Sequence, residues 1–480
     1  MSAYEKSQSP QSPLIRWDGS LANRADTRRL SAYIAAGLLA LSAGSGELYG
    51  WPRLASLEGT RVLWLLLPAA LFQIPVLAEC QRAALLTGRS FFALAGAASP
   101  FWGIVSILCT LVSFLWLGGW LTGSAAMIAI LIGVPAANIK LATNILAVVL
   151  AILLGWPLLT KRLLARYVSI VLKIFAVATF LAALLSLFLL PDRFQTLTHY
   201  IGEMFRPHFD VFTIRRGATD VDLILAITFL GLGSWASVLY TGYASLERYG
   251  RTSSGDLWRN PNDGEDSGAP GALSLLSNWR EDLRQWYRHT YADTSIGIVL
   301  NLVSTGLLTF LSVRLLYASG LKIGRDYDLL SQQARFFEPL LGQFAVPAFI
   351  LIGSAFLLDT WIGFVPLMAK GFQEGLQTSI PGLRRIGEES LYRWILLVLA
   401  IQTILTAMVT APGNLIRLTA ICLNVTHPIV IALLLYLNYI YLPRLYGKAI
   451  RPGVWALVSL CVAFIGYTLL AVWYLIRILS

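Results

Sequence analysis

Residues 41–50 have the sequence LSAGSGELYG, from Leu41 to Gly50, in the middle of an apolar segment long enough to cross a membrane. The stretch contains three glycines and two serines. Each glycine costs about 1 kcal/mol in a helix interior. In contact with lipid, a break there would leave backbone groups without hydrogen-bond partners. The stretch therefore predicts an unwound segment that faces a cavity lined by protein.

A second apolar segment is interrupted in the same way. Its middle has the sequence GLGSWAS, from Gly231 to Ser237, and it lies five segments after the first one. Interrupted helices at corresponding positions of two halves are typical of transporters built from inverted repeats. Unwound carbonyls bind cations there, and the N-termini of half-helices bind anions. The alternative is that the glycines only permit close packing between helices.

The rest of the chain has the composition of a membrane protein. Of its 480 residues, 56% are hydrophobic and 13% are charged, and the mean hydropathy is +0.66. A soluble domain carries about 25% charged residues, so we expect lipid to surround this chain. A polar tail at 1–30 precedes about eleven segments of membrane-spanning length, namely 31–57, 62–86, 101–132, 141–159, 163–190, 221–249, 296–317, 346–368, 391–409, 418–439 and 454–476.

The distribution of positive charge predicts the orientation. With the N-terminal tail in the cytoplasm, the cytoplasmic loops receive most of the lysines and arginines, as the positive-inside rule requires. The C-terminus is then expected outside. The same asymmetry accounts for the net charge of +11 without a nucleic-acid partner.

One loop, 251–293, is long and is predicted to lie in the cytoplasm. It begins with Gly, Asp, Asn and Ser, and it ends in a stretch, 279–288, that separates its tryptophans and arginines onto two helical faces. That pattern predicts a helix lying in the plane of the membrane interface. The alternative is an ordinary helix within a soluble loop.

Features of an enzyme are missing from the sequence. It contains no nucleotide-binding loop and no set of nucleophile and base. Its four cysteines and four histidines are dispersed, without the spacing of a zinc site. We therefore predict neither an enzyme nor a resident cofactor.

At this point the chain resembles the natural resistance-associated macrophage protein (Nramp) family of divalent-metal transporters, in a distant bacterial branch. The resemblance rests on 63–89, with its Thr-Gly-Arg end, on 242–250, and on Asn438 with the later Leu442-Pro443. It implies an all-α LeuT-type fold in a bacterial cytoplasmic membrane. Two inverted five-helix repeats are expected, followed by an eleventh helix, at 31–190, 221–442 and 454–477.

The chain departs from the family at its metal-binding motifs. The family carries Asp-Pro-Gly-Asn in the first break, where this chain has Gly44, Ser45, Gly46 and Glu47. The family's Met-Pro-His in the second break becomes Trp235-Ala236-Ser237, which removes the soft thioether that suits transition metals. A further family histidine corresponds to Gly242.

The remaining groups favour a hard cation. Glu47 is the candidate metal ligand, because a carboxylate with hydroxyl and carbonyl oxygens suits magnesium, calcium or manganese. The resemblance adds a polar contact on helix 10, near Thr426. The predicted substrate site is therefore Gly44, Ser45, Gly46, Glu47, Gly233, Ser234, Trp235, Ser237 and Thr426.

Ionisable residues inside the membrane are candidates for ion coupling. Lys173 on helix 5 and Asp359 with Thr360 on helix 8 correspond to the elements that flank the coupling ion in LeuT-type folds. A structural ion pair is the alternative for Lys173. Glu79 is predicted to be structural, either paired with Arg82, close by on helix 2, or capping a helix end.

The sequence thus predicts a secondary active transporter of divalent cations through a non-standard site. A second hypothesis keeps the fold and makes the substrate a small organic solute such as an amino acid. A third is a membrane sensor that transports nothing. The predicted partners are the lipid bilayer and a small ion or molecule, and the oligomeric state stays open.

Overall fold

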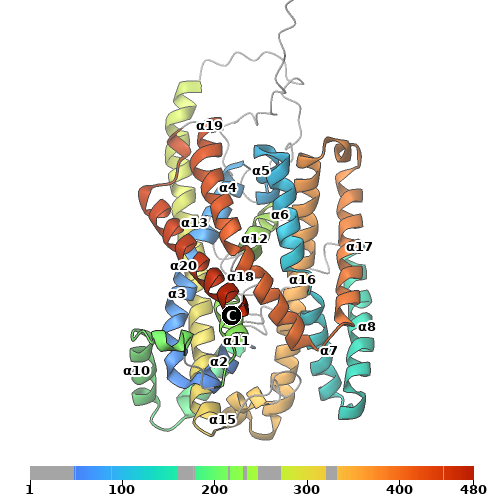
Figure 1. The fold of residues 1–480 in the computed structure, drawn as a ribbon, viewed down its shortest axis with the longest axis vertical. Helices are drawn as coiled ribbons and strands as arrows, with labels where there is room; N and C mark the ends of the chain where they lie inside the picture. The colour runs from blue at the N-terminus through green and yellow to red at the C-terminus, as the bar shows by residue number, and fades with distance from the viewer. Residues whose placement is uncertain are drawn as a thin grey trace, which may run out of the picture.

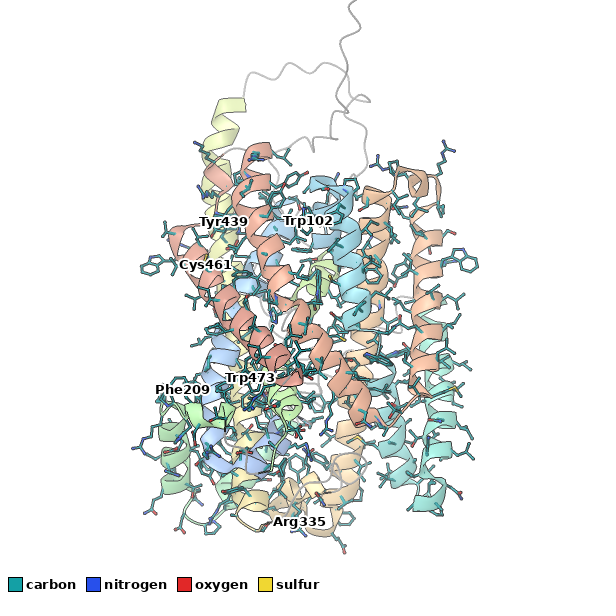
Figure 2. The ribbon with its side chains drawn as sticks, viewed as in Figure 1. Trp102, Phe209, Arg335, Tyr439, Cys461 and Trp473 are labelled. Carbon is teal, nitrogen blue, oxygen red and sulfur yellow. The ribbon has the colours of Figure 1, made fainter. Side chains whose placement is uncertain are left out.

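The computed structural model describes residues 48, 50–87, 89–160, 177, 179–213, 217–230, 235–246, 272–320, 332–446 and 448–479. Every regular element in this part of the chain is a helix, and most helices lie along one axis as a bundle (Figure 1). We call one end of the bundle the α10 end, which also carries α15, and the other the α19 end, which also carries α5. Phe209 and Arg335 lie at the α10 end, and Tyr439 and Trp102 lie toward the α19 end (Figure 2).

The first half of the chain forms helices in the predicted order. Its first turn is made by Gly59, whose φ of 70° favours glycine and redirects the chain from α2 into the next helix. The described elements are α2 (Trp51–Glu58), η2 (Gly59–Leu65), α3 (Leu66–Leu71), α4 (Gln73–Thr87), α5 (Phe91–Ala98), α6 (Pro100–Ser113), α7 (Gly118–Leu131), η3 (Ala136–Asn138), α8 (Ile139–Thr160), α10 (Arg193–Met204) and η4 (Phe209–Phe212).

The second half begins with a divided helix. The predicted interruption of helix 6 is confirmed, because one helix ends at Thr228 and the next begins at Trp235. The elements are α11 (Asp220–Thr228), α12 (Trp235–Leu246), α13 (Ala272–Ser312), η6 (Val313–Tyr317), η7 (Ala334–Phe337), α15 (Glu338–Leu341), η8 (Gly342–Phe344), α16 (Ala345–Ser379), η9 (Pro381–Arg385), α17 (Glu388–Ala407), α18 (Pro412–Tyr436), η10 (Leu437–Tyr441), α19 (Leu442–Tyr446), η11 (Lys448–Ile450) and α20 (Val454–Leu479).

Eight helices among the described residues are long and apolar enough to cross a membrane, or nine if one sharply bent pair counts as a span. That pair, 179–189 and α10, is bent by 116°, and Asp192 at the bend has φ 56°. Helix 6 is not among these spans, because its two parts, α11 and α12, are each too short to cross a membrane. Helix 1 is described only from Leu48 onward.

The prediction of a separate interfacial helix at 279–288 is wrong. These residues are helical, but they belong to α13, which runs without interruption over 41 residues into the membrane-spanning segment. Figure 1 shows this helix standing along the bundle and extending past its α19 end. The second part of the predicted cytoplasmic loop is therefore a continuation of helix 7.

Apolar side chains are distributed as expected for a bundle in lipid. Large side chains are fully buried between the helices, as Trp51, Trp120 and Trp361 are. On the outside of α17 and α20, Trp394 is 63% exposed and Leu469 is 64% exposed. An apolar exterior around an apolar interior is stable only where lipid replaces water.

Candidate functional site

One part of the site is the contact between α2 and α11. Helix α2 follows the first predicted break, and helix α11 precedes the interruption of helix 6. A Cβ atom on Gly50 would lie 3.0 Å from the Cα of Ala226, so glycine favours this close approach and a larger residue would push the two backbones apart. Arg53, about one turn further along α2, meets Asp222, one turn earlier on α11. The two half-helices are thus antiparallel, and Leu48 before α2 and Leu230 after α11 adjoin the same end of this contact.

A glutamine side chain is bonded to a backbone carbonyl beside each break. The Nε2 atom of Gln333 donates to the carbonyl of Leu48, just after the first break, at 2.5 Å. The Nε2 atom of Gln73 donates to the carbonyl of Leu230, just before the second break. Both glutamines are buried, and neither Oε1 atom has a hydrogen-bond partner among the described residues.

Helix α18 contributes Asn424 to the same level. Arg417 of α18 bonds to Asp222, and Asn424 follows it by seven residues, which is two helical turns on the same face. Because α18 and α11 run in the same direction from the α10 end, this places Asn424 beside the end of α11 and the second break. The side chain is fully buried, and neither its Nδ2 nor its Oδ1 has a partner in the described structure.

Pro428 makes this position more polar. A proline has no N–H, so the carbonyl four residues earlier, that of Asn424, lacks its helical donor. The helix nevertheless continues through Pro428. Asn424 therefore combines a side-chain amide without a partner among the described residues with a backbone carbonyl that lacks its usual donor four residues later.

The predicted residues of helix 6 that the structure describes lie in the first turn of α12. Trp235 is fully buried, and its ring stacks on that of Phe92 with 6.3 Å between centroids and 15° between planes. Phe91 meets the same ring edge-on. Ser237 is also fully buried. This tryptophan therefore belongs to an aromatic cluster between α12 and α5.

Thr426 lies on a different face of α18 from Asn424. Its hydroxyl is 2.9 Å from that of Ser113 on α6, and it also donates to the carbonyl of Cys422 at 2.8 Å. Thr426 thus contacts helix 3. The polar group of α18 that faces the breaks is Asn424.

The coupling candidates are described only in part. Asp359 and Thr360 are buried in α16, which packs against α12, and the Thr360 hydroxyl donates to the carbonyl of Phe356 at 3.1 Å. Lys173 lies outside the described residues, as do Gly44, Ser45, Gly46, Glu47, Gly233 and Ser234.

A buried ion cluster lies between the breaks and the α10 end. Asp222 accepts from Arg53 Nε at 3.0 Å and from Arg417 Nη2 at 2.7 Å. Its other oxygen accepts from the backbone and hydroxyl of Thr219, which completes a capping box at the start of α11. The cluster ties α2, α11 and α18 together on the side of the site that faces the α10 end.

A second buried cluster lies toward the α19 end. Arg82 Nε donates to Glu79 at 2.6 Å, which confirms the predicted pair. Glu79 also accepts from Tyr291 Oη at 2.5 Å and from Asn438 Nδ2 at 3.1 Å, and Arg82 donates to the carbonyl of Ile450 at 3.0 Å. This cluster joins α4, α13, η10 and η11.

The described part of the site offers oxygen and amide groups. Within the described ranges, no group of three or more His, Cys, Asp or Glu side chains could hold a metal ion. The buried side chains of Gln73, Gln333 and Asn424 offer amide oxygens, which are ligands that suit hard cations.

Comparison with solved structures identifies this arrangement. The manganese transporter of Eremococcus coleocola has a TM-score of 0.64 in one mutant form and 0.56 in complex with an aromatic bis-isothiourea compound. Each match is 15% identical and covers 94% of this chain and 87% of that one. The protein has the Nramp-like fold of these transporters.

The same LeuT-type architecture extends to a second transporter. Mhp1, of the nucleobase-cation-symport-1 family, has a TM-score of 0.51 at 14% identity, over 92% of this chain and 89% of its own. No protein-family model matches the chain, and no curated protein matches it. The Nramp-like fold, with its apolar spans, establishes an integral membrane protein.

Sequence reasoning missed several polar groups of this candidate site. Gln73 stands in an apolar stretch of helix 2, and Asn424 lies four residues before a proline. Gln333 gives no such signal, because it lies outside the segments predicted to cross the membrane. The partners of Asp222 are far away in sequence, so only the folded chain shows them.

Proposed function

We propose that the protein is a secondary active transporter, which carries a small substrate past the two helix breaks by alternating access. The breaks adjoin a close contact of two half-helices and lie between two buried ion clusters. The fold is shared with transporters of two kinds. We further propose a bacterial cytoplasmic membrane, with the N-terminus in the cytoplasm and the C-terminus outside.

The substrate we propose is a divalent cation. The observation that carries this choice is Asn424, a fully buried amide at the level of the breaks with no partner among the described residues. An unpaired buried polar group costs about 1–3 kcal/mol, so a ligand at this position is favoured. A manganese transporter with the same fold supports a metal.

Glu47 is the proposed carboxylate of this site, with Gly44, Ser45, Gly46, Gly233 and Ser234 supplying carbonyls and hydroxyls. The thioether and imidazole of the family motifs are replaced, so the site favours a hard cation such as magnesium, calcium or manganese. Lys173, Asp359 and Thr360 are proposed to carry the coupling proton or ion. Lys173→Ala should then remove the pH dependence of uptake and leave substrate binding unchanged.

A small organic solute is the second candidate. Asn424 can donate as well as accept hydrogen bonds, which suits a substrate with both kinds of group. Mhp1 has been solved with bromovinylhydantoin bound, in the same fold. A sensor without transport is the third candidate, and an absence of any substrate-driven flux would favour it.

Uptake into liposomes tests the metal proposal. Purified protein is assayed with magnesium, manganese, calcium and zinc, with and without a pH gradient. We expect uptake of at least one cation, which Glu47→Gln and Asn424→Leu abolish. Asn414→Leu is the control, since Asn414 is exposed at the start of the same helix. Uptake that survives Glu47→Gln would reject the assignment, and folded protein without cation uptake would favour an organic solute.

A further inference from the structure

We propose that Gln73 and Gln333 are ligands of the substrate site. In this structure their amide N–H groups donate to the carbonyls of Leu230 and Leu48, and in the proposed cation-bound protein a cation takes the position of those hydrogens. This inference rests on the proposed transport of a divalent cation. It adds two residues that do not belong to either break.

The two carbonyls occupy equivalent positions. Leu48 precedes the end of α2 at Glu58 by ten residues, and Leu230 follows the start of α11 at Asp220 by ten residues. At 1.5 Å per residue, both lie about 15 Å from the α10 end of their half-helices. This is half of a hydrocarbon core of about 30 Å, where a midplane site is expected.

Each carbonyl lies at the edge of a described helix. The helix α11 ends at Thr228, two residues before Leu230, and Pro52, four residues after Leu48, has no N–H to donate to that carbonyl. Gln73 supplies that donor from α4 and also bonds to the carbonyl of Ala69 at 3.0 Å. Gln333 supplies the donor for Leu48 at 2.5 Å from the connection before η7.

In both glutamines only the Nε2 end of the side-chain amide forms hydrogen bonds with the described residues. Gln73 is 1% exposed and Gln333 is 0% exposed, so water does not reach the other end. Neither Oε1 has a partner in the part of the chain that is described. A buried amide oxygen left without a donor is unfavourable. The unused oxygens are therefore poised for a positively charged ligand.

An amide can change its role by rotating about its last side-chain bond. With Nε2 toward the carbonyl it forms a hydrogen bond, as here. With Oε1 toward the carbonyl, two oxygens face each other and repel, unless a cation lies between them. Magnesium, calcium and manganese take such oxygens as ligands. A bound cation would thus gain a carbonyl and an amide oxygen at each break.

Paired substitutions separate a ligand from a structural role. Gln73→Glu removes the donor but adds a charged oxygen, whereas Gln73→Leu removes both. Binding of manganese, magnesium and calcium is measured by calorimetry on the purified full chain in nanodiscs. We expect Gln73→Glu to tighten binding of the transported cation by about tenfold and Gln73→Leu to weaken it by about tenfold. Gln333→Glu should likewise tighten binding of the cation, and Gln333→Leu should weaken it.

Gln402 is the matched control. It also donates to two backbone carbonyls at a helix interruption, those of Phe114 at 3.1 Å and Leu115 at 3.0 Å, away from the breaks. Gln402→Glu should leave the dissociation constant unchanged. If Glu and Leu at positions 73 and 333 both weaken binding, or leave it unchanged, the ligand role is overturned.

The outcomes distinguish this inference from the function on which it rests. If the unmodified protein binds none of the three cations, the proposed cation transport fails and the glutamine role fails with it. If the unmodified protein binds a cation, but the Glu and Leu substitutions do not change its affinity in opposite directions, only the proposed role of the glutamines fails. Should the Gln73 variants not fold, the Gln333 pair decides.

Discussion

The carboxylate of Asp222 lies 3.0 Å from Nε of Arg53, and this buried pair joins the two half-helices on one side of the breaks. Both side chains are almost fully buried, at 1% and 4% exposure. A second arginine, Arg417, reaches the same oxygen from α18. In this conformation the three helices therefore close together between the site and the α10 end.

The first prediction is that Asp222→Asn destabilises the folded protein by about 3–5 kcal/mol, because it leaves two buried arginines without their charge partner. Unfolding in detergent, followed by intrinsic fluorescence, measures the effect. The control is Arg393→Gln, which breaks an exposed pair with Glu389. That change should cost less than about 1 kcal/mol. Equal losses would contradict a special role for the buried cluster.

The second prediction concerns access from the α10 end. Ala420 is buried between Arg417 and Asn424 on the same helix. Loss of the Asp222 charge should let α2 and α11 separate from α18. An Ala420→Cys reporter should then react about tenfold faster with a membrane-impermeant maleimide in the Asp222→Asn background. Labelling of the chain without the reporter gives the background from the native cysteines.

The third prediction concerns the cluster at the α19 end. Tyr291→Phe removes a hydrogen bond to a buried carboxylate and should cost about 1–3 kcal/mol in the free energy of unfolding. Tyr467→Phe is the matched control, since its hydroxyl is buried without a hydrogen-bond partner among the described residues. Its removal should be neutral or stabilising. If Tyr467→Phe lowered the free energy of unfolding more than Tyr291→Phe, the hydrogen bond from Tyr291 to Glu79 would not be stabilising.

The fourth prediction tests the close contact of the half-helices. Gly50→Ala puts a methyl group 3.0 Å from the backbone of Ala226, where neither helix can yield without moving the other. We expect a loss of about 1–3 kcal/mol and impaired uptake. Gly306→Ala, in α13 with nothing within 4 Å of the added carbon, should be neutral or slightly stabilising. If both variants behave alike, the contact is not tight.

The fifth prediction concerns pH, at a group outside the spans. Partial burial raises the pKa of the Glu203 carboxyl, but the hydrogen bond from His208 and the charges of His208 and Arg206 outweigh it, so the pKa lies below its usual value. A carboxyl group whose pKa is lowered by folding stabilises the folded protein at pH values above the usual carboxyl pKa. This stabilisation is lost as the pH falls through the pKa of the folded state.

Glu203→Gln should accordingly lower the melting temperature by about 1–3 °C near neutral pH. The difference from the unmodified protein should shrink below about pH 4. Differential scanning fluorimetry over a pH series measures both values. A difference that grows on acidification would reverse the sign of this argument.

The interruption of helix 6 and the fold class could be predicted from the sequence because their causes are local. Glycine and serine inside an apolar segment predicted the interruption between Thr228 and Trp235, and the structure has it. The pairing of Glu79 with Arg82 was equally local, three residues apart on one helix. Contacts of this kind need no knowledge of how the helices are arranged.

The rest of the site depended on helix rotation and on distant partners. Thr426 and Asn424 are two residues apart, which is about 200° around a helix, so they face nearly opposite directions. Only the packing of α18 tells which one faces the breaks. The partners of Asp222 lie 169 and 195 residues away in sequence. The stretch at 279–288 failed as a prediction because an amphipathic pattern fits both an interfacial helix and an extended one.

The uninterrupted helix α13 is much longer than one membrane span. With 41 residues it is about 60 Å long, roughly twice the thickness of the hydrocarbon core. A tilt of about 10° at the level of the site would swing the far end of such a rod by about 5 Å. A pair of spin labels, one on that end and one on the neighbouring α19, would therefore report each turnover of the site at a distance, beyond the surface of the membrane.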